Sequence, residues 1–271
     1  MESFINKFGY TVIEHVIVNP WWVLVIEFFM VLIVYLAIDG IYILLKMNLI
    51  SKRGEGYSRR TEGPVRILVA GDSTGVGTGA EDVKNTLSGY FAHDFPEVDV
   101  VNVSVNGSVT QSVYGQLEAG HPHTYDLVVI STGGNDTWAL TPMNKLRDDL
   151  RKVLHKAKEM SNQRAIVIFF GNVGSAPFFP YPLRAFLLWR AERINELFFE
   201  VTHEEGVPFI ELFTQSEKNP FVKDPKKYFA LDGLHPNDAG YWEWYKCIWQ
   251  LMVEKSLVFS GKSIHLKENR E

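Results

Sequence analysis

Two short motifs, far apart in the chain, carry the side chains of a nucleophilic reaction. The first is Gly71-Asp72-Ser73, in which Ser73 offers a hydroxyl directly after an apolar run. The second is Asp232-Gly-Leu-His235, in which a carboxylate precedes an imidazole by three positions. On one turn of chain, the carboxylate can orient one ring nitrogen of His235 and leave the other to face Ser73. This combination predicts acyl transfer through the serine, with His235 as the base and Asp232 as its partner.

Two further motifs supply hydrogen-bond donors for the negative charge that develops on a substrate oxygen during acyl transfer. Gly107 follows a second apolar run and can present its backbone N–H, and Asn135, in Gly134-Asn135-Asp136, follows a third run with a side-chain amide. Together with the N–H of Ser73, these groups make three candidate donors of an oxyanion hole. The alternative is structural, since glycine and asparagine also favour the turns between strands and helices.

The glycine-rich stretch around Ser73 matches other motifs less well. No Gly-Lys-Ser/Thr follows at the spacing of a phosphate-binding loop, and Gly75, Gly77 and Gly79 do not form the Gly-x-Gly-x-x-Gly of a dinucleotide site. The spacing of Gly71, Ser73 and Gly75 does fit the nucleophile elbow of α/β-hydrolases. That fold places its elbow after several strands, whereas Ser73 follows the first strand predicted for this domain, so the match is interpreted as coincidental.

Parallel β-strands are predicted to bring the motifs together. From Val65 onward, short apolar runs alternate with longer amphipathic ones, which is typical of a parallel sheet covered on both faces. The predicted class is α/β, with a five-stranded parallel sheet in a three-layer α/β/α domain. The strands would end at one edge, where open α/β folds bind ligands. We expect strands at 65–70, 98–105, 126–131, 165–170 and 208–212, and helices at 82–94, 110–119, 142–161, 183–205 and 237–257.

In these motifs and their order, the chain resembles the SGNH hydrolase superfamily, the GDSL-type esterases and lipases. The similarity covers about residues 65–257, and Thr74 stands where many relatives have leucine. The resemblance implies a flavodoxin-like α/β/α domain that acts as a serine-dependent ester hydrolase without a metal or organic cofactor. It also implies site residues, which are a Ser73–His235–Asp232 triad and an oxyanion hole formed by the Ser73 N–H, the Gly107 N–H and the Asn135 side chain.

A long apolar segment precedes the predicted domain. Trp21 to Leu45 is apolar except for Glu27, Asp39 and Gly40, and is long enough for one membrane-spanning helix. A cleavable signal peptide is disfavoured by the length and by the lack of a small-x-small cleavage site. A helix lying flat on the bilayer is disfavoured because no polar face is present. The predicted organisation is a tail at 1–19, a transmembrane helix at 20–46, a basic linker at 47–64, the hydrolase domain at 65–258 and a polar tail at 259–271.

The charges that flank the apolar segment favour one orientation in the membrane. Lys7 alone precedes the segment, together with two acidic residues, whereas six basic residues follow it: Lys46, Lys52, Arg53, Arg59, Arg60 and Arg66. The tendency of positive charge to stay in the cytoplasm predicts a single-pass protein with a cytoplasmic domain. Long domains also cross membranes regardless of charge, so the opposite orientation stays open.

Composition excludes several classes of function. The net charge is −5, and no basic stripe is interleaved with aromatic residues, so a nucleic-acid partner is not expected. Cys247 is the only cysteine, which rules out an internal disulfide and a cysteine zinc cluster, and we expect its thiol to be buried. His121 and His123 are interpreted as loop residues because no third metal ligand stands at a suitable spacing.

The residue pattern leaves the substrate open. The stretch 171–183 is rich in aromatic residues and proline and is predicted to lie at the same sheet edge as Ser73. It could wall an acyl or alcohol pocket, or it could pack on the domain or rest on a bilayer. The candidate substrates are a small-molecule ester, a lipid or amphiphilic ester and an acetylated glycan. The alternatives to a hydrolase are an acyltransferase with the same triad and a non-catalytic, membrane-tethered binding module.

Overall fold

A computed structural model describes residues 21–47, 55–61, 63–119, 124–161, 164–169, 175–212 and 219–255. The expected tails at 1–19 and 259–271 and the pair His121 and His123 lie outside these residues. Internal contacts divide the chain into two compact units, Met1–Asn48 and Leu49–Glu271.

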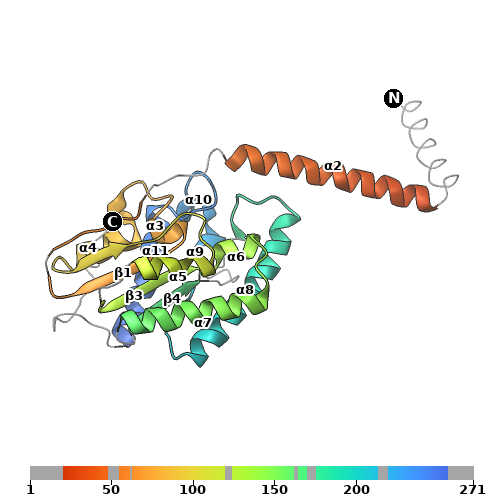
Figure 1. The fold of residues 1–271 in the computed structure, drawn as a ribbon. Helices are drawn as coiled ribbons and strands as arrows, with labels where there is room; N and C mark the ends of the chain where they lie inside the picture. Colours follow the sequence, from red (N-terminus) through yellow and green to blue (C-terminus); the bar gives the residue numbers. More distant parts are fainter. Residues whose placement is uncertain are drawn as a thin grey trace. The chain divides into compact units, whose positions relative to one another are not determined.

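The first unit contains the helix α2, Trp21–Met47 (Figure 1). Its large apolar side chains are exposed along most of its length, and residues Trp21–Lys46 are long and apolar enough to cross a membrane. A helix was predicted for this segment, and the structure confirms it as a helix. A signal sequence near an N-terminus would satisfy the same criteria of length and composition.

The second unit is built on a five-stranded parallel sheet with the strand order β2-β1-β3-β4-β5. β1 and β3, two of the three inner strands, are almost entirely buried and mostly apolar, which is why they appear in the sequence as apolar runs. The predicted fold class and strand number are therefore confirmed. The strands are β1 Arg66–Gly71, β2 Asp99–Asn102, β3 Leu127–Thr132, β4 Ala165–Phe169 and β5 Phe209–Glu211.

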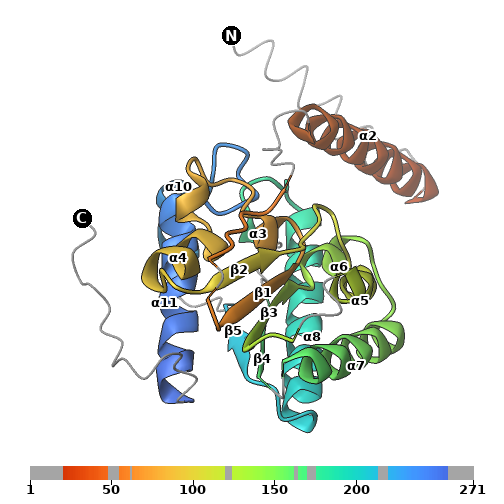
Figure 2. The ribbon, with the colours of Figure 1, turned by 60° about the vertical axis from the view of Figure 1, so that its left-hand side comes forward.

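Helices cover both faces of the sheet (Figure 2). On one face lie α5 Thr110–Ala119, α7 Met143–Met160 and α8 Leu183–Glu204, whose aliphatic side chains form one buried cluster with those of β1, β3 and β4. On the other face, α4 Leu87–Asp94 and α11 Asp238–Glu254 pack through aromatic rings such as Phe91 and Tyr245, whose centroids lie 5.4 Å apart. These five helices begin and end close to the predicted positions. The exception is the stretch 82–94, which is divided into η1 Val83–Asn85 and α4 because the Thr86 side chain caps α4 at Gly89 N–H.

Four short helices were not predicted, and they lie in the loops that follow β1, β3 and β5. They are α3 Ser73–Val76, α6 Gly134–Trp138, α9 Pro220–Lys223 and α10 Pro225–Tyr228. Each is a single turn, so none contains enough residues to show a 3.6-residue apolar period.

Part of the stretch expected to be a linker is held against the sheet. Arg59 and Val100 exchange two backbone hydrogen bonds of 2.8 Å in an antiparallel bridge to β2. The Arg59 guanidinium also donates to the carbonyls of Ala92, Phe95 and Val98. Residues 55–61 therefore behave as part of the folded unit.

The expectation of a buried Cys247 was wrong. The thiol lies on the exposed side of α11, whereas Tyr245, Ile248 and Trp249 occupy the side that faces the sheet. Aromatic residues of this helix occupy the positions that face the core. Cys247 lies between them in sequence, and its side chain is on the outer face of the helix.

Candidate active site

Ser73 begins a one-turn helix at the carboxyl end of β1. Asp72 caps this helix, since its carboxylate accepts hydrogen bonds from the backbone N–H and the hydroxyl of Thr74 at 2.9 and 2.7 Å. The turn requires glycine at position 71, because a Cβ there would lie 1.9 Å from the carbonyl oxygen of Ser131 on β3. The close approach of β1 and β3 thus directs the chain so that the serine stands at the sheet edge.

His235 connects Ser73 with Asp232, 162 positions after the serine in sequence. Its Nε2 atom lies 3.0 Å from the Ser73 hydroxyl oxygen, and its Nδ1 atom lies 2.8 Å from a carboxylate oxygen of Asp232. Both distances are those of hydrogen bonds. The three side chains that the sequence singled out are in direct contact, in the order serine, histidine, aspartate.

The carboxylate of Asp232 is held by its own loop as well as by the histidine. One oxygen accepts the backbone N–H groups of Leu234 and His235 at 2.8 and 3.0 Å, and the other faces the imidazole. Burial alone would raise the pKa of Asp232, but the hydrogen bond and charge of His235 and the two backbone N–H groups lower it to about 2. An ionised carboxylate at Nδ1 favours the tautomer in which Nε2 is free to accept a proton.

Gly79 allows the first loop to pack against the histidine loop. Its φ angle is +97°, and a Cβ at this position would lie 2.3 Å from the Pro236 carbonyl oxygen and 2.7 Å from the Cβ of His235. In the sequence, Gly79 stands out only as one glycine of a spacing that does not fit a dinucleotide site. Its role depends on a contact with a residue more than 150 positions away, which no local pattern reveals.

The two remaining predicted site residues lie in the adjacent loops after β2 and β3. Gly107 has a φ of +76°, and the side-chain amide of Asn135, at the start of α6, donates to the carbonyl of Ser108 at 2.9 Å. Asp136 strengthens this connection, because its carboxylate accepts from the N–H and the hydroxyl of Thr110 at 2.8 and 2.7 Å. Gly107 and Asn135 are thus brought to neighbouring loops at the same sheet edge, and their roles as oxyanion donors remain predictions.

Gln116, a buried residue of α5, joins the serine loop to the Gly107 loop and was not singled out from the sequence. Its side chain accepts from the Gly71 N–H at 2.7 Å and donates to the Gly71 carbonyl and the Ser108 hydroxyl, both at 2.9 Å. A polar residue on an amphipathic helix gives no sign of which backbone it will meet, so only the fold reveals this role.

Within the part of the chain that the structure describes, no group of three His, Cys, Asp or Glu side chains is arranged to hold a metal ion. Burial raises the pKa of Asp72 to about 6, although the hydrogen bonds from Thr74 oppose the shift. Among the carboxyl groups that the structure describes, the large pKa shifts of Asp72 and Asp232 both lie beside the serine and histidine.

The parallel five-stranded sheet between two helix layers, with a serine, histidine and aspartate in contact at its carboxyl edge, defines an α/β/α hydrolase of the SGNH type. Comparison with protein families identifies the group within this class. A model of the GDSL-like lipase/acylhydrolase family matches residues 69–243, from β1 into α11, and the chain belongs to this family. It is therefore an enzyme of the ester-hydrolase class, as the resemblance implied.

Solved structures agree with this assignment at the level of the fold. The chain is similar to a lipolytic G-D-S-L family protein from Veillonella parvula (17% identity, TM-score 0.57, covering 70% of this chain and 98% of that one). It is also similar to TesA (21%, 0.55, 71% and 99%) and to a lipase/acylhydrolase from Enterococcus faecalis (23%, 0.50, 70% and 96%). Comparison with curated protein sequences gave no match.

Proposed function

We propose that the protein hydrolyses carboxylic esters through a covalent acyl-enzyme formed on Ser73. The observation that carries this proposal is the continuous contact from the Ser73 hydroxyl through both ring nitrogens of His235 to the Asp232 carboxylate. A hydroxyl is a weak nucleophile at neutral pH unless an adjacent base accepts its proton, and this contact provides that base.

In the first step, the Ser73 oxygen attacks the ester carbonyl carbon while its proton passes to Nε2 of His235. Asp232 stabilises the imidazolium that forms. The carbonyl oxygen becomes an oxyanion, for which we propose the N–H groups of Ser73 and Gly107 and the side-chain amide of Asn135 as donors. When this intermediate collapses, the imidazolium returns its proton to the departing alcohol, and the acyl group stays on Ser73.

In the second step, water replaces the alcohol. His235 accepts a proton from the water as its oxygen attacks the acyl carbon, and the collapse of the second intermediate releases a carboxylic acid and restores the Ser73 hydroxyl. The chain's own residues carry every proton transfer in this cycle. The orientation of His235 by Asp232 is needed in both steps, so that loop acts throughout the reaction.

For the rest of the chain, we propose a membrane anchor at 20–46 and a hydrolase domain at 65–258, joined by the basic stretch 47–64, of which residues 55–61 pack on β2 as part of the folded unit. The length and apolar composition of α2 support the anchor, and the basic residues that follow it support a cytoplasmic domain. Substrates of this arrangement would be small or amphiphilic esters, with acetylated glycans as the alternative if the domain lies outside the cytoplasm.

Steady-state and burst kinetics with p-nitrophenyl esters of increasing chain length, alongside acetylated sugars, test the proposal. We expect Ser73→Ala to lower kcat by about 10³-fold or more. Ser112→Ala, which removes an exposed serine of α5, is the matched control and should behave as the wild type. A folded Ser73→Ala variant with full activity would refute the nucleophile, and transfer of the acyl group to added alcohols in place of water would indicate an acyltransferase.

A further inference from the structure

Large apolar side chains are exposed on the loops that surround the candidate active site. We call four of them the rim residues: Val105, Trp138, Leu140 and Leu231, of which the first three have exposed fractions of 55, 46 and 52% and Leu231 is fully exposed. They follow β2 and β3 or precede the histidine loop, so all four belong to the carboxyl edge of the sheet. Exposed apolar groups gathered at one edge mark a surface that meets another apolar phase.

The rim residues are also close in sequence to the predicted site residues. Leu231 directly precedes Asp232, Val105 lies two positions before Gly107, and Trp138 lies three positions after Asn135. The ring of Trp138 packs on Phe179, with centroids 6.1 Å apart, and the neighbouring Phe178 N–H donates to the Gly233 carbonyl at 2.9 Å. The loops after β3 and β4 and the histidine loop therefore form a connected apolar rim.

Leu140 is held in a conformation that leucine rarely adopts. Its φ of +55° is the only positive φ of a non-glycine residue among those that the structure describes. A β-carbon disfavours this region, and such strain is typically kept where a side chain must be presented in a particular way. Here the result is that a leucine points into solvent beside the Asn135 helix.

Basic side chains accompany the apolar rim. Lys223, Lys226 and Lys227 are exposed on α9 and α10, where Asp224 caps α10. The backbone of α10 is tied to the histidine loop, since Asn237 N–H donates to Tyr228 and the Asn237 side chain donates to Lys227. Lysines beside apolar groups suit the anionic headgroups and the acyl region of a bilayer.

Residues 55–61, the first described residues of the second unit, lie along the edge strand β2. Residues 55–61 run antiparallel to β2. Gly56 lies beside Asn102 at the carboxyl end of β2, since a Cβ on Gly56 would lie 2.2 Å from the Asn102 side chain. Thr61 lies at the amino end of β2, where its N–H donates to the Asp99 carboxylate. The chain therefore enters the folded unit at its carboxyl edge. Only residues 48–54 connect the end of α2 to Glu55, and fully extended they reach at most about 30 Å.

We propose that the carboxyl edge of the sheet, with its rim residues and the lysines of α9 and α10, is a docking surface for an anionic lipid bilayer. This is the same bilayer that α2 is proposed to span. The consequence of docking for substrate, which rests on the proposed function, is that the enzyme acts on esters carried by membrane amphiphiles. Such an ester would pass from the bilayer to Ser73 without crossing water.

A depth probe tests the docking directly. The full chain, with Cys247→Ser and a single new cysteine at Leu231→Cys, would carry an environment-sensitive nitrobenzoxadiazole label in phosphatidylcholine/phosphatidylglycerol vesicles. We expect blue-shifted emission that doxyl-labelled lipids quench. Val253→Cys, an exposed position at the far end of α11, is the matched control and should stay in water. Equal, unquenched emission at both positions would overturn the proposal.

Activity provides a second, independent result. The double variant Leu140→Asn/Leu231→Ser changes two exposed side chains, and asparagine tolerates a positive φ better than leucine does. We expect its ratio of kcat/KM for a long-chain ester within the vesicle to kcat/KM for a water-soluble ester to fall about tenfold. An unchanged ratio would contradict docking. If the wild type hydrolyses neither ester while the label at 231 is quenched, the proposed function fails and the docking surface stands.

Discussion

The carboxyl of Asp72 lies one residue before the nucleophile and is almost completely buried. Its oxygen caps the helix that begins at Ser73, so the group has a structural task that needs an acceptor and does not need a negative charge. Burial raises the pKa of Asp72 to about 6, above its ordinary value of 3.8, because the charged form is poorly solvated there. At a pH between these two pKa values, the folded protein therefore keeps a proton on Asp72, whereas the unfolded chain has released it.

This difference predicts how stability depends on pH. Between about pH 4 and pH 6 the folded state holds more protons at Asp72 than the unfolded state, so the wild type loses about 2–3 kcal/mol of unfolding free energy as the pH rises through this range. Asp72→Asn keeps the cap and removes the charge, so we expect this contribution to disappear. Urea unfolding of both proteins at pH 4 and pH 7 measures it. A difference between wild type and variant that does not change with pH would contradict the assignment.

Gln116 fixes the peptide that precedes the Asp72–Ser73 turn, and its effect can be separated from simple packing. Gln116→Leu leaves the buried Gly71 N–H without its acceptor, so we expect a loss of about 1–3 kcal/mol in unfolding free energy and a lower kcat. Gln116→Glu keeps an acceptor but, when ionised, cannot donate to Gly71 or Ser108. Its deficit should therefore shrink as the pH is lowered and the carboxyl is protonated. A deficit in Gln116→Glu that is independent of pH would show that the lost hydrogen-bond donor is not its cause.

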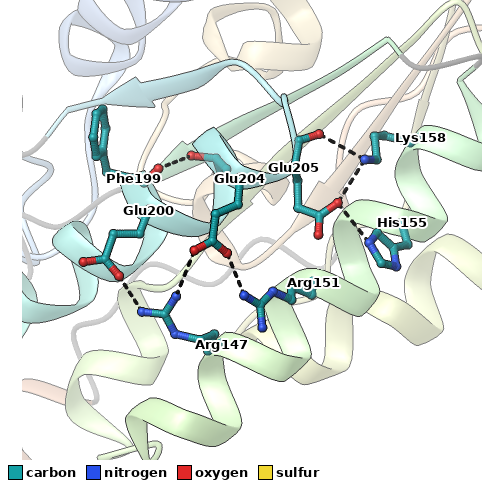
Figure 3. Close-up of polar contacts among 9 residues, drawn as sticks. Arg147, Arg151, His155, Lys158, Phe199, Glu200, Glu204 and Glu205 are labelled. Carbon is teal, nitrogen blue, oxygen red and sulfur yellow. Dashed lines mark hydrogen bonds and ion pairs between the residues drawn. The ribbon is translucent and has the colours of Figure 1, made fainter.

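At the scale of elements, α7 and α8 are joined by a line of ion pairs on the surface of the second unit (Figure 3). Arg147 reaches Glu200 and Glu204, Arg151 reaches Glu204, and both His155 and Lys158 reach Glu205, at distances from 2.5 to 3.9 Å. The basic residues follow each other at intervals of three or four positions, which places them on one face of α7. The apolar face of the same helix lies on the sheet.

The least exposed of these pairs, Lys158 with Glu205, supplies a test. Burial would raise the pKa of Glu205, but Lys158 and His155 lower it below its ordinary value of 4.5. The pair therefore stabilises the fold above pH 4.5, and this stabilisation is lost as the pH falls through the lowered pKa. We expect Lys158→Met to reduce the unfolding free energy at pH 7 by about 1 kcal/mol or less, and the loss to shrink in high salt. Lys152→Met, exposed on the same helix, is the control. A loss that persists in high salt would indicate packing of the lysine stem instead of charge.

How far the elements could be predicted depended on their length. The five strands lie within mainly apolar runs of the sequence, and the helices α5, α7, α8 and α11 are long enough to show a period, so both kinds were found from the sequence. The helices α3 and α6 are single turns that start at Ser73 and Gly134. The motifs at these positions were recognised in the sequence, but the short helices that contain them were not predicted. The contact among Ser73, His235 and Asp232 was predictable because these residue types are chemically distinctive, and their catalytic roles stay a prediction. Gly79 and Gln116 act through contacts between distant parts of the chain, which the local sequence does not encode.

At the scale of the whole molecule, the chain joins an apolar helix to a hydrolase of the GDSL-like family. The proposed anchor predicts that the full-length protein stays in the membrane fraction after alkaline carbonate extraction, since α2 has no hydrophilic face and a spanning helix is not released by high pH. The measurement is extraction followed by intact-mass analysis of the membrane protein.

The signal-sequence alternative gives a different result in the same experiment. Cleavage would produce a chain that begins beyond α2 and is released by carbonate, which would contradict the anchor. Replacing Leu32 and Leu36 by arginine provides a matched variant, because two charges near the middle of the segment oppose insertion by roughly 2.5–3.5 kcal/mol each. We expect that variant to leave the membrane fraction.

The central claim is that Ser73 forms a covalent bond to the reacting group, and the most direct measurement is mass spectrometry of the full chain after reaction with a fluorophosphonate. We predict one phosphonyl group per chain, located on the peptide that contains Ser73, absent from Ser73→Ala and strongly reduced in His235→Ala. A folded wild-type protein that stays unlabelled, or one that carries the label on another residue, would contradict the account.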